Sequence, residues 1–476
     1  MEKHRPPMVL ISGAGIGGLV LAMLLERANI PYHVFEKAPT VKPLGAALVL
    51  NGNILPAFDQ LGLLERLTEM GYPLAILDLC KENLKPIGLI DFTDFKEKTG
   101  YAFLAFHRPD VYDLMLSHIP AKKISFNKKV VWLLQNDEGV MIRTSDNETH
   151  HGDILVGADG AFSAVRQNLY KDMAKKNLLP TSDTQSPKVD RICLVGTTRP
   201  LDPEEYPELK EKQRSVFTTV IGQDKAHTWL TCTLPGNRIC FSIRKQLNEE
   251  ASKEAMFRTS EWTPEQHTKM IRDVYNFPIL NGREEDRKVL GDLIDATDPD
   301  SISQVFVEDK LYETWHHGRT VLIGDAVHKM APNAGQGGVN AMEDAVVLAN
   351  CLYEISDGHQ AVTPERIAEA FKDYREQRYI HAKYQVENSA SMTRVLSGQK
   401  MSDRMQRAIM YNVPKWLVSH KYLKQAGYRP QIMFLPTVPN PPGLSTVPQK
   451  PSKRYQREQA EKAKENERRL AKSSMS

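Results

Sequence analysis

The sequence lacks the long apolar run that a membrane-spanning helix requires, since no stretch reaches about 18 apolar residues. It shows no secretory signal either, because its first apolar stretch, Met8 to Ser12, leads directly into glycines in the manner of a buried strand. The formal net charge is only +3, which gives no reason to expect nucleic acid as the main partner. The sequence therefore predicts neither a transmembrane anchor nor a nucleic-acid-binding protein.

Cysteine is scarce, and its positions argue against two classes of site. The number of cysteines is odd, and no pair has the spacing of metal ligands. We therefore expect no disulfide framework, no metal site, and a cytoplasmic protein in a reducing compartment. A peripheral membrane contact through residues 416–434 stays open as an alternative. The five cysteines are Cys80, Cys193, Cys232, Cys240 and Cys351.

The composition is that of an ordinary soluble protein, with 41% hydrophobic and 25% charged residues in a chain of 476. Short apolar strands alternate with amphipathic helices in the first third, a pattern that predicts a parallel sheet in an α/β fold. Between about residues 190 and 245 the pattern changes to β-branched and aromatic segments joined by short polar turns, which is typical of an antiparallel sheet. The strand-to-helix pattern returns near Thr320, so the antiparallel sheet is expected to interrupt one nucleotide-binding domain.

The end of the chain is basic and poor in apolar residues. Residues 450–476 contain nine Lys or Arg and four Glu, and residues 436–451 are rich in proline. Such a composition cannot bury much surface, so we expect a linker followed by a disordered tail. An anionic membrane or an acidic partner for the tail is the alternative interpretation.

The first motif runs from Gly13 to Gly18, with Gly15 between them, directly after a strand and at the start of a helix. Glycines at these positions permit a tight turn, a close approach of backbone to a pyrophosphate, and packing of the helix on the strand. The helix N-terminus then offers free N–H groups to the phosphates. Glu36 lies 23 residues after Gly13, at the end of the second strand, where a carboxylate can accept hydrogen bonds from a ribose. The motif predicts a dinucleotide but does not separate FAD from NAD.

Two later motifs follow predicted strands in the same way. The second runs from Gly157 to Arg166 and contains Asp159. The third runs from Gly324 to Gly338 and contains the sequence Pro-Asn-Ala-Gly-Gln-Gly. Taken singly, the two aspartates could be ordinary turn residues.

With these three motifs in this order, the sequence resembles the p-hydroxybenzoate-hydroxylase-like family, the single-component (group A) FAD-dependent monooxygenases. The resemblance covers about residues 8–355 and is weakest in the middle sheet. The wording of the third motif is most similar to that of fungal FAD epoxidases of terpenoid pathways, which are enzymes of secondary metabolism. The resemblance implies a Rossmann-like FAD-binding domain at residues 1–185 and 301–390, interrupted by a β-sheet substrate domain at 186–300. A C-terminal helical region at 391–435 and the linker with its tail at 436–476 would follow.

The resemblance also implies roles for residues of the first half of the chain. Gly13, Gly15 and Gly18 would hold the FAD pyrophosphate, and Glu36 would bind the adenosine ribose. The loop that ends at Val49 would pass beside the flavin and give it a backbone contact.

Five further roles follow from the same resemblance. Arg108 would lie near the cofactor, and Asp159 would support both FAD and NAD(P)H. Asp325 would bind the ribityl chain, whose hydroxyls could satisfy a carboxylate at the end of a buried strand. Pro332 would lie near the flavin carbon that carries oxygen, and Gly338 would give a backbone contact. Arg108 on its own could be a surface charge, but its position in the match favours the cofactor role.

The implied activity is the hydroxylation or epoxidation of a small apolar substrate, aromatic or terpenoid-like, with NAD(P)H and O₂ through a flavin C4a-hydroperoxide. His328 resembles a structural histidine of the family, although a covalent link to flavin is the alternative. An FAD-dependent reductase or dehydrogenase without oxygen insertion, and a non-catalytic flavoprotein that serves as a binding module, also stay open. A plain NAD-dependent dehydrogenase is disfavoured by the motif from Asp325 to Gly338. No substrate-contacting residue can be chosen from the sequence.

Overall fold

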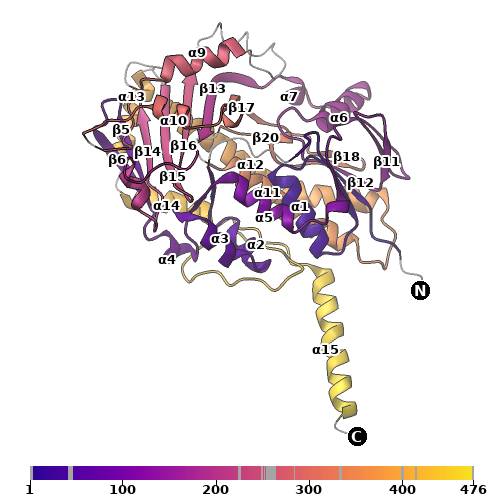
Figure 1. Cartoon of the computed structure of the whole chain (residues 1–476). Helices are drawn as coiled ribbons and strands as arrows, with labels where there is room; N and C mark the ends of the chain where they lie inside the picture. Colours follow the sequence, from indigo (N-terminus) through magenta and orange to yellow (C-terminus); the bar gives the residue numbers. More distant parts are fainter. Residues whose placement is uncertain are drawn as a thin grey trace.

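The structure is a computed structural model that describes residues 4–40, 47–222, 227–247, 250, 252, 264–283, 285–331, 335–397, 401–412 and 415–473. Figure 1 shows two regions side by side, a parallel sheet with helices and a large antiparallel sheet, with one helix projecting from the body. The main hydrophobic core lies between the parallel sheet and its helices, and a separate cluster lies under the antiparallel sheet.

The parallel sheet is built on strands that are buried on both faces. All four residues of β1, Val9–Ser12, are buried, as expected for an apolar strand covered by helices on either side. β1 pairs in parallel with β2 and with β12, so two of the turns predicted to bind nucleotide leave the same edge of the sheet. The strand order is β18 (His316–His317), β19 (Thr320–Leu322), β12 (Ile154–Gly157), β1, β2 (Tyr32–Phe35) and β8 (Ile124–Ser125). This arrangement confirms the predicted α/β class.

The antiparallel sheet is wider than the segment 186–300 that the sequence predicted for it. Its strand order is β20 (His328–Lys329), β17 (Ser303–Leu311), β13 (Lys188–Thr197), β16 (Arg238–Gln246), β15 (His227–Leu234), β14 (Phe217–Ile221), β5 (Ile76–Lys81) and β6 (Pro86–Asp91). β14 pairs in parallel with β5, so an N-terminal hairpin extends the sheet at one edge. β17 and β20 extend it at the other edge. Pairing between strands so far apart in the chain leaves no local pattern in the sequence.

Two small sheets complete the strands. One has the order β11 (Thr149–Gly152), β10 (Val140–Thr144) and β9 (Val130–Gln135), and the other has the order β3 (Leu48–Leu50), β7 (Leu104–Phe106) and β4 (Tyr72–Pro73). The two faces of β3 pack differently: Leu48 and Leu50 belong to the main core, whereas Val49 packs in the cluster that includes Phe217 of β14.

Helices cover both regions. Those of the described N-terminal half are α1 (Ile16–Arg27), α2 (Leu55–Gln60), α3 (Leu64–Met70), α4 (Phe95–Thr99), α5 (Arg108–Ser117), α6 (Ala164–Lys175) and α7 (Thr181–Thr184). Those that follow are α9 (Pro264–Val274), α10 (Leu290–Asp295), α11 (Gly337–Ile355), α12 (Pro364–Ser397), α13 (Met401–Asn412), α14 (Lys415–Ala426) and α15 (Lys453–Ser473). Short 3-10 turns are η1 (Ala121–Lys123), η2 (Pro207–Lys210), η3 (Pro299–Ser301) and η4 (Gly324–Ala326).

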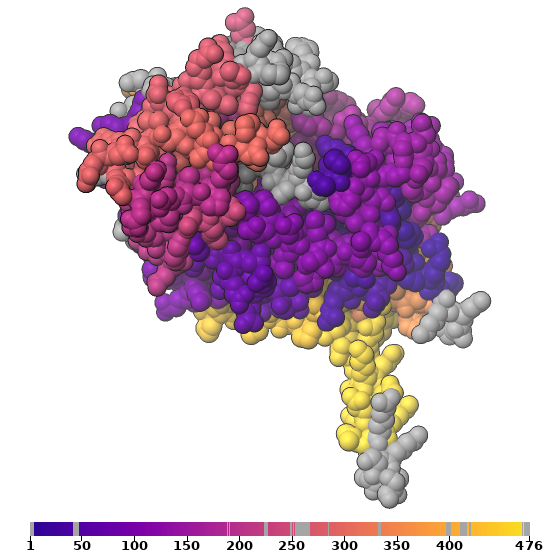
Figure 2. Space-filling view, in the orientation of Figure 1, coloured from indigo at the N-terminus to yellow at the C-terminus, as the bar shows by residue number. Residues whose placement is uncertain are grey.

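The end of the chain differs from the expected linker and disordered tail. The segment between α14 and α15 packs on the body, with Ile432 and Phe434 in the main core. α15 then stands clear of the body in Figures 1 and 2. The Arg454 guanidinium at its base lies 3.9 Å from the centre of the Tyr353 ring and also pairs with Glu458. Residues of high helix propensity, with such i,i+4 pairs, stabilise a helix without burial along its length.

The described helices and the segment 416–434 show how the chain could meet a membrane. None of the helices there is both long enough and apolar enough to cross a bilayer. The C-terminal part of the segment 416–434 is not an apolar surface, since Ala426, Ile432 and Phe434 are buried. The open alternative of a membrane contact through this segment therefore fails for its second half, because its apolar side chains fill the core instead.

Candidate active site

The turn after β1 is shaped by contacts within the chain. Gly13 has a positive φ of 107° and donates its N–H to the Phe35 carbonyl oxygen at 2.8 Å. A Cβ at residue 13 would lie 2.5 Å from the Ala158 oxygen, and one at residue 18 would lie 2.1 Å from the Gly13 oxygen. Both glycines are therefore required by the packing of the turn itself.

Gly15 differs from the other two glycines of the motif. Its φ of −69° suits any residue, and the nearest atom to a Cβ there would be the Ala158 oxygen at 3.9 Å. The space in front of Gly15 faces the N-terminus of α1, which has no side-chain cap and no acidic residue in its first turn. Uncapped N–H groups at a helix start are the arrangement that holds a phosphate. The packing of the described chain therefore does not require glycine at residue 15, and the predicted role of Gly15 toward a pyrophosphate stays a prediction.

Glu36 follows β2 and is held against the first turn. Its carboxylate accepts hydrogen bonds from the Ala14 N–H at 2.8 Å and from the Ala38 N–H at 2.9 Å. The side chain is partly exposed, so a hydroxyl group can still reach it. The structure therefore holds Glu36 against Ala14 of the first motif, and its role toward a ribose stays a prediction.

Asp159 follows β12 on the neighbouring strand. Its Oδ2 accepts a hydrogen bond from the Val165 N–H at 3.1 Å, whereas its buried Oδ1 has no hydrogen-bond partner among the residues that the structure describes. Burial raises the pKa of Asp159 above its ordinary range, against the opposing hydrogen bond from Ser163. A buried polar atom without a partner is costly, so Oδ1 is an acceptor that a ligand could satisfy.

Arg166 joins the second motif to the third. Its guanidinium donates to the Ala161 oxygen at 2.7 Å and to the Ala326 oxygen at 2.9 Å, and it lies 4.4 Å from the centre of the Tyr312 ring. The side chain is buried. Sequence reasoning gave Arg166 no role beyond its place in the motif, and its structural role is to fix one turn against the other.

Asp325 lies in η4, directly after the strand β19, and pairs with Lys329 at 2.8 Å. Burial would raise the pKa of Asp325, but Lys329, His328 and Arg108 together hold it below the ordinary value. Burial would likewise lower the pKa of Lys329, and Asp325 keeps it raised. Asp325 therefore has a lysine partner, which the sequence did not predict. Its predicted role, to bind the hydroxyls of a ribityl chain, stays a prediction.

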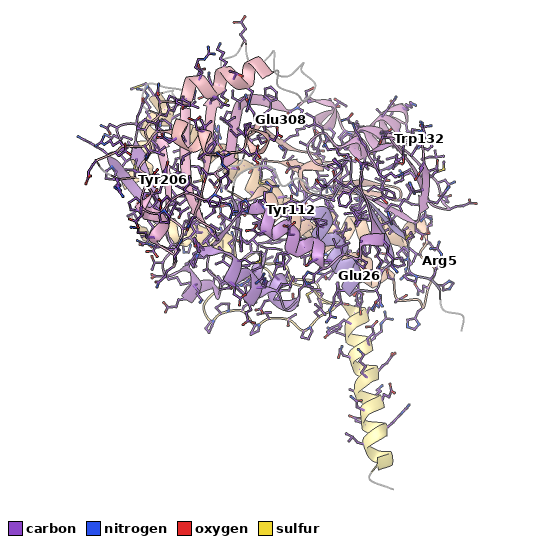
Figure 3. All side chains as sticks on the ribbon, in the orientation of Figure 1. Arg5, Glu26, Tyr112, Trp132, Tyr206 and Glu308 are labelled. Carbon is purple, nitrogen blue, oxygen red and sulfur yellow. The ribbon has the colours of Figure 1, made fainter. Side chains whose placement is uncertain are left out.

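Arg108 begins α5, and its positive charge acts on Asp325 and Lys329. It donates a hydrogen bond to the Tyr112 hydroxyl at 3.2 Å, and Figure 3 marks Tyr112 on this helix. Its buried Nε has no hydrogen-bond partner within the described part of the chain. Because its positive charge also acts on Asp325 and Lys329, the structure brings this arginine to the third motif. Arg108 is thus more than an isolated surface charge.

The start of α11 meets the first motif. A Cβ at Gly338 would lie 3.3 Å from Leu48 of β3 and 3.8 Å from Ile16 of α1, so three elements converge there. Val49 is the neighbour of Leu48 and lines a cavity on the other side of β3. The structure therefore brings Gly338, Val49 and the first glycine motif together. Pro332, predicted to lie beside the flavin, falls outside the described residues.

A buried ionic cluster supports the third motif from behind. The Asp344 carboxylate accepts hydrogen bonds from the Gly324 N–H at 2.8 Å and from Arg378 Nε at 2.7 Å, and it pairs with His328 Nε2 at 2.6 Å. Arg378 also pairs with Glu343 at 2.7 Å, and all of these side chains are fully buried. His328 therefore holds the turn in place, which agrees with its predicted structural role. Sequence reasoning missed Asp344 and Arg378, because nothing in a helical pattern marks a residue whose partner lies 34 positions away.

The two carboxylates of this cluster differ in protonation. Burial raises the pKa of Glu343 to about 8, with Asp344 adding to the rise and Arg378 opposing it. The pKa of Asp344 is lowered, since His328 and Arg378 outweigh the effect of burial. One arginine cannot fully neutralise two adjacent buried carboxylates, so Asp344 keeps the charge.

The Glu343→Gln variant is expected to change the pH dependence of stability. The raised folded-state pKa means that this group stabilises the wild type at low pH and that its contribution is lost as pH rises from about 4.5 to about 8. Glutamine does not titrate, so the variant should gain stability relative to the wild type as pH rises over that window. Urea unfolding at pH 6 and pH 8 measures this, and equal pH slopes for the two proteins would contradict it.

An apolar cavity lies between β3, the antiparallel sheet and helices α12 and α14. Gly335 and Gln336 also line it, directly before α11, so one end of the cavity adjoins the third motif. Its polar side chains include Thr219, Ser242 and the buried Arg244. The other lining residues are Ala47, Val49, Asn51, Leu74, Leu77, Leu79, Ile90, Phe92, Phe103, Val195, Phe217, Leu230, Cys232, Cys240, Asn388, Met392, Leu396, Tyr422 and Gln425.

The cysteines of the cavity are not suited to nucleophilic chemistry. All five cysteines of the chain are buried and free. Burial raises the pKa of Cys240 to about 11, and it also raises that of Cys232. A thiolate is the reactive form, so these side chains act as apolar wall. The cysteines therefore supply no nucleophile to the cavity.

Comparison with known proteins identifies the family. The chain matches the family model of the FAD binding domain over residues 7–192 and 282–389, which leaves out the strands β14, β15 and β16. The FAD-dependent monooxygenase paxM of Penicillium paxilli is 30% identical over 400 residues, covering 80% of this chain and 76% of the relative. The aurachin C monooxygenase/isomerase of Stigmatella aurantiaca is 30% identical over 349 residues, covering 72% of this chain and 80% of the relative.

Solved structures agree on the fold. Klebsiella pneumoniae HpxO, in complex with FAD and uric acid, has a TM-score of 0.68 to this chain at 21% identity, over 88% of this chain and 96% of HpxO. The likeness concerns the fold alone, whereas the family match and the relatives concern the activity. The chain belongs to the p-hydroxybenzoate-hydroxylase-like FAD-dependent monooxygenases and takes FAD as its cofactor.

Proposed function

We propose that this monooxygenase uses NAD(P)H and O₂ to hydroxylate or epoxidise a small apolar substrate, aromatic or terpenoid-like, by way of a flavin C4a-hydroperoxide. The observation that supports the substrate class is the apolar cavity, whose wall ends at Gly335 and Gln336 of the flavin motif. A ligand in this cavity would be removed from water and held next to the flavin, as oxygen transfer requires.

The positions of FAD groups are part of the proposal. The pyrophosphate would lie at Gly13, Gly15 and Gly18, with the adenosine ribose on Glu36. Asp159 Oδ1 and the carboxylate of Asp325 would accept hydrogen bonds from hydroxyl groups of the cofactor. The backbone near Val49 and Gly338 would contact the ring. These assignments rest on the convergence of the turns and on the space in front of Gly15.

The chain's charges suit a cofactor that becomes negative on reduction. Arg108 and Lys329 lie around Asp325, and the N-terminus of α11 begins at Gly337. A positive helix end and nearby cations stabilise an anion in a water-poor site. Pro332 is proposed, from the family pattern alone, to lie on the side of the ring where oxygen is carried.

The test uses the purified, FAD-loaded protein with a metabolite extract, NADPH and ¹⁸O₂. The proposal predicts oxygen-dependent NADPH oxidation and a product that carries one ¹⁸O atom by mass spectrometry. Turnover that does not need O₂ would instead support the reductase. Bound FAD without any NADPH or NADH oxidation, with every substrate of the extract, would support a binding module.

Filling the cavity should separate substrate turnover from flavin binding. In the Thr219→Trp variant the indole would occupy the cavity, so product formation should fall at least about ten-fold while FAD content stays the same. Thr219→Val keeps the shape of the side chain and should retain most activity. Liquid chromatography of products, with flavin absorbance as a second readout, checks both variants. Full product formation by Thr219→Trp would show that this cavity is not the substrate site.

A further inference from the structure

Helix α13 buries one arginine and exposes a row of apolar side chains. Arg407 is buried and donates a hydrogen bond to the Leu396 oxygen at 3.3 Å. Met401, Met405 and Ile409 are 82%, 64% and 58% exposed. These three residues are spaced four apart and so form one stripe along the helix. A helix on the surface of a water-soluble protein normally has the reverse arrangement.

The neighbouring helix α14 adds one apolar and several basic side chains to its exposed face. Leu417 is 42% exposed, and His420, Lys421 and Lys424 are exposed on the same helix. Arg404 of α13 is exposed as well, whereas Arg407 is buried, and α14 contains no acidic residue. Exposed apolar side chains on one helix, followed in the chain by a helix with exposed basic side chains, are what a segment in the interface of an anionic bilayer requires.

We infer that α13 and α14 form a membrane-docking surface, with Met401, Met405 and Ile409 inserted among the acyl chains of a bilayer that contains anionic lipid. A second copy of the chain is a poorer occupant. An interface that placed this face against itself would bring the basic residues together. One stripe of three side chains also offers far less than the roughly 800 Å² per partner that a stable dimer buries.

The docking surface adjoins the substrate cavity. Leu396, whose carbonyl holds Arg407, lines the cavity, as do Met392 on the same helix α12 and Tyr422 on α14. α13 therefore follows one helix of the cavity wall, α12, and precedes another, α14, which contacts β6. An apolar substrate dissolved in the bilayer would have a short path to the site. The docking surface itself rests on the exposed residues and does not depend on the proposed reaction.

Vesicle co-sedimentation of the FAD-loaded full chain tests the inference. Vesicles of phosphatidylcholine with about one third phosphatidylserine should bind the wild type. The triple variant Met401→Ser, Met405→Ser, Ile409→Ser should bind at least about ten-fold more weakly, because serine gains nothing from entering the acyl region. The variant should keep its flavin absorbance and circular dichroism, since all three side chains are exposed.

Two matched controls alter exposed apolar residues elsewhere. Leu134→Ser on β9 and Leu470→Ser on α15, which are 51% and 71% exposed, should bind vesicles like the wild type. The inference is wrong if the wild type binds no vesicles, or if the triple variant binds as well as these controls, as it would if basic α15 alone made the contact. Light scattering that shows a wild-type dimer lost in the triple variant would assign the stripe to self-association instead.

Discussion

Replacing Gly15 with alanine should leave the apoprotein folded and weaken FAD binding by about 100-fold, which corresponds to about 2.7 kcal/mol. Nothing in the protein prevents this substitution, because the backbone at residue 15 is extended and a Cβ there would have its nearest neighbour at 3.9 Å. The added methyl group would instead occupy the space through which the pyrophosphate approaches the α1 N-terminus. Flavin fluorescence titration measures the affinity, and thermal unfolding of the apoprotein measures the fold.

Gly18→Ala is the matched comparison. Its Cβ would lie 2.1 Å from the Gly13 oxygen, so this variant should lose stability in the apoprotein as well as FAD. Overpacking of this kind costs about 1–3 kcal/mol or more. The two variants therefore distinguish a glycine that FAD binding requires from a glycine that the stability of the apoprotein requires. Wild-type FAD affinity in Gly15→Ala would remove the assignment of that residue to the pyrophosphate.

The Asp344→Ala variant should be destabilised by about 3–5 kcal/mol. Its carboxylate has three partners, His328, Arg378 and the Gly324 N–H, and all of the side chains are fully buried. Without Asp344 the buried Arg378 keeps only Glu343 as a carboxylate partner, and the turn that carries Asp325 loses its anchor. Urea unfolding at pH 7.5 measures the loss, and reduced FAD content should accompany it.

An exposed ion pair provides the control for this prediction. Asp172 of α6 and Lys176, which directly follows this helix, lie 2.7 Å apart, and about half of each side chain is exposed to solvent. Asp172→Ala should therefore change the free energy of unfolding by less than about 1 kcal/mol. A change for Asp344→Ala as small as that for Asp172→Ala would show that the buried cluster does not support the turn.

The parts of the site that could be predicted from the sequence are those with local signals. Gly13 to Gly15 lie between β1 and α1, Gly18 lies in the first turn of α1, and Asp159 and Asp325 follow apolar strands, as the sequence pattern predicted. Parallel pairing of β1 with β2 and β12 then brings two of these turns to one edge. Local pattern and topology agree here, as they do in sequences that specify one fold.

The features that the sequence did not reveal depend on distant partners. Lys329 as the partner of Asp325 was not foreseen, since many residues of a loop can reach a carboxylate. The pairing of β5 with β14 and the cluster of Asp344 with Arg378 join segments far apart in the chain. The outward-facing stripe on α13 was missed for a related reason, because periodicity shows that a helix has an apolar side but not which way that side faces.

A crystal structure of the FAD complex tests the central claim most directly, namely that three separate turns converge on one flavin nucleotide. The account predicts the pyrophosphate in front of Gly15 at the start of α1, the adenosine ribose on Glu36, the ribityl chain at Asp325, and the ring beside Gly338 at the end of the apolar cavity. FAD bound elsewhere, or bound without contact to two of these turns, would contradict it.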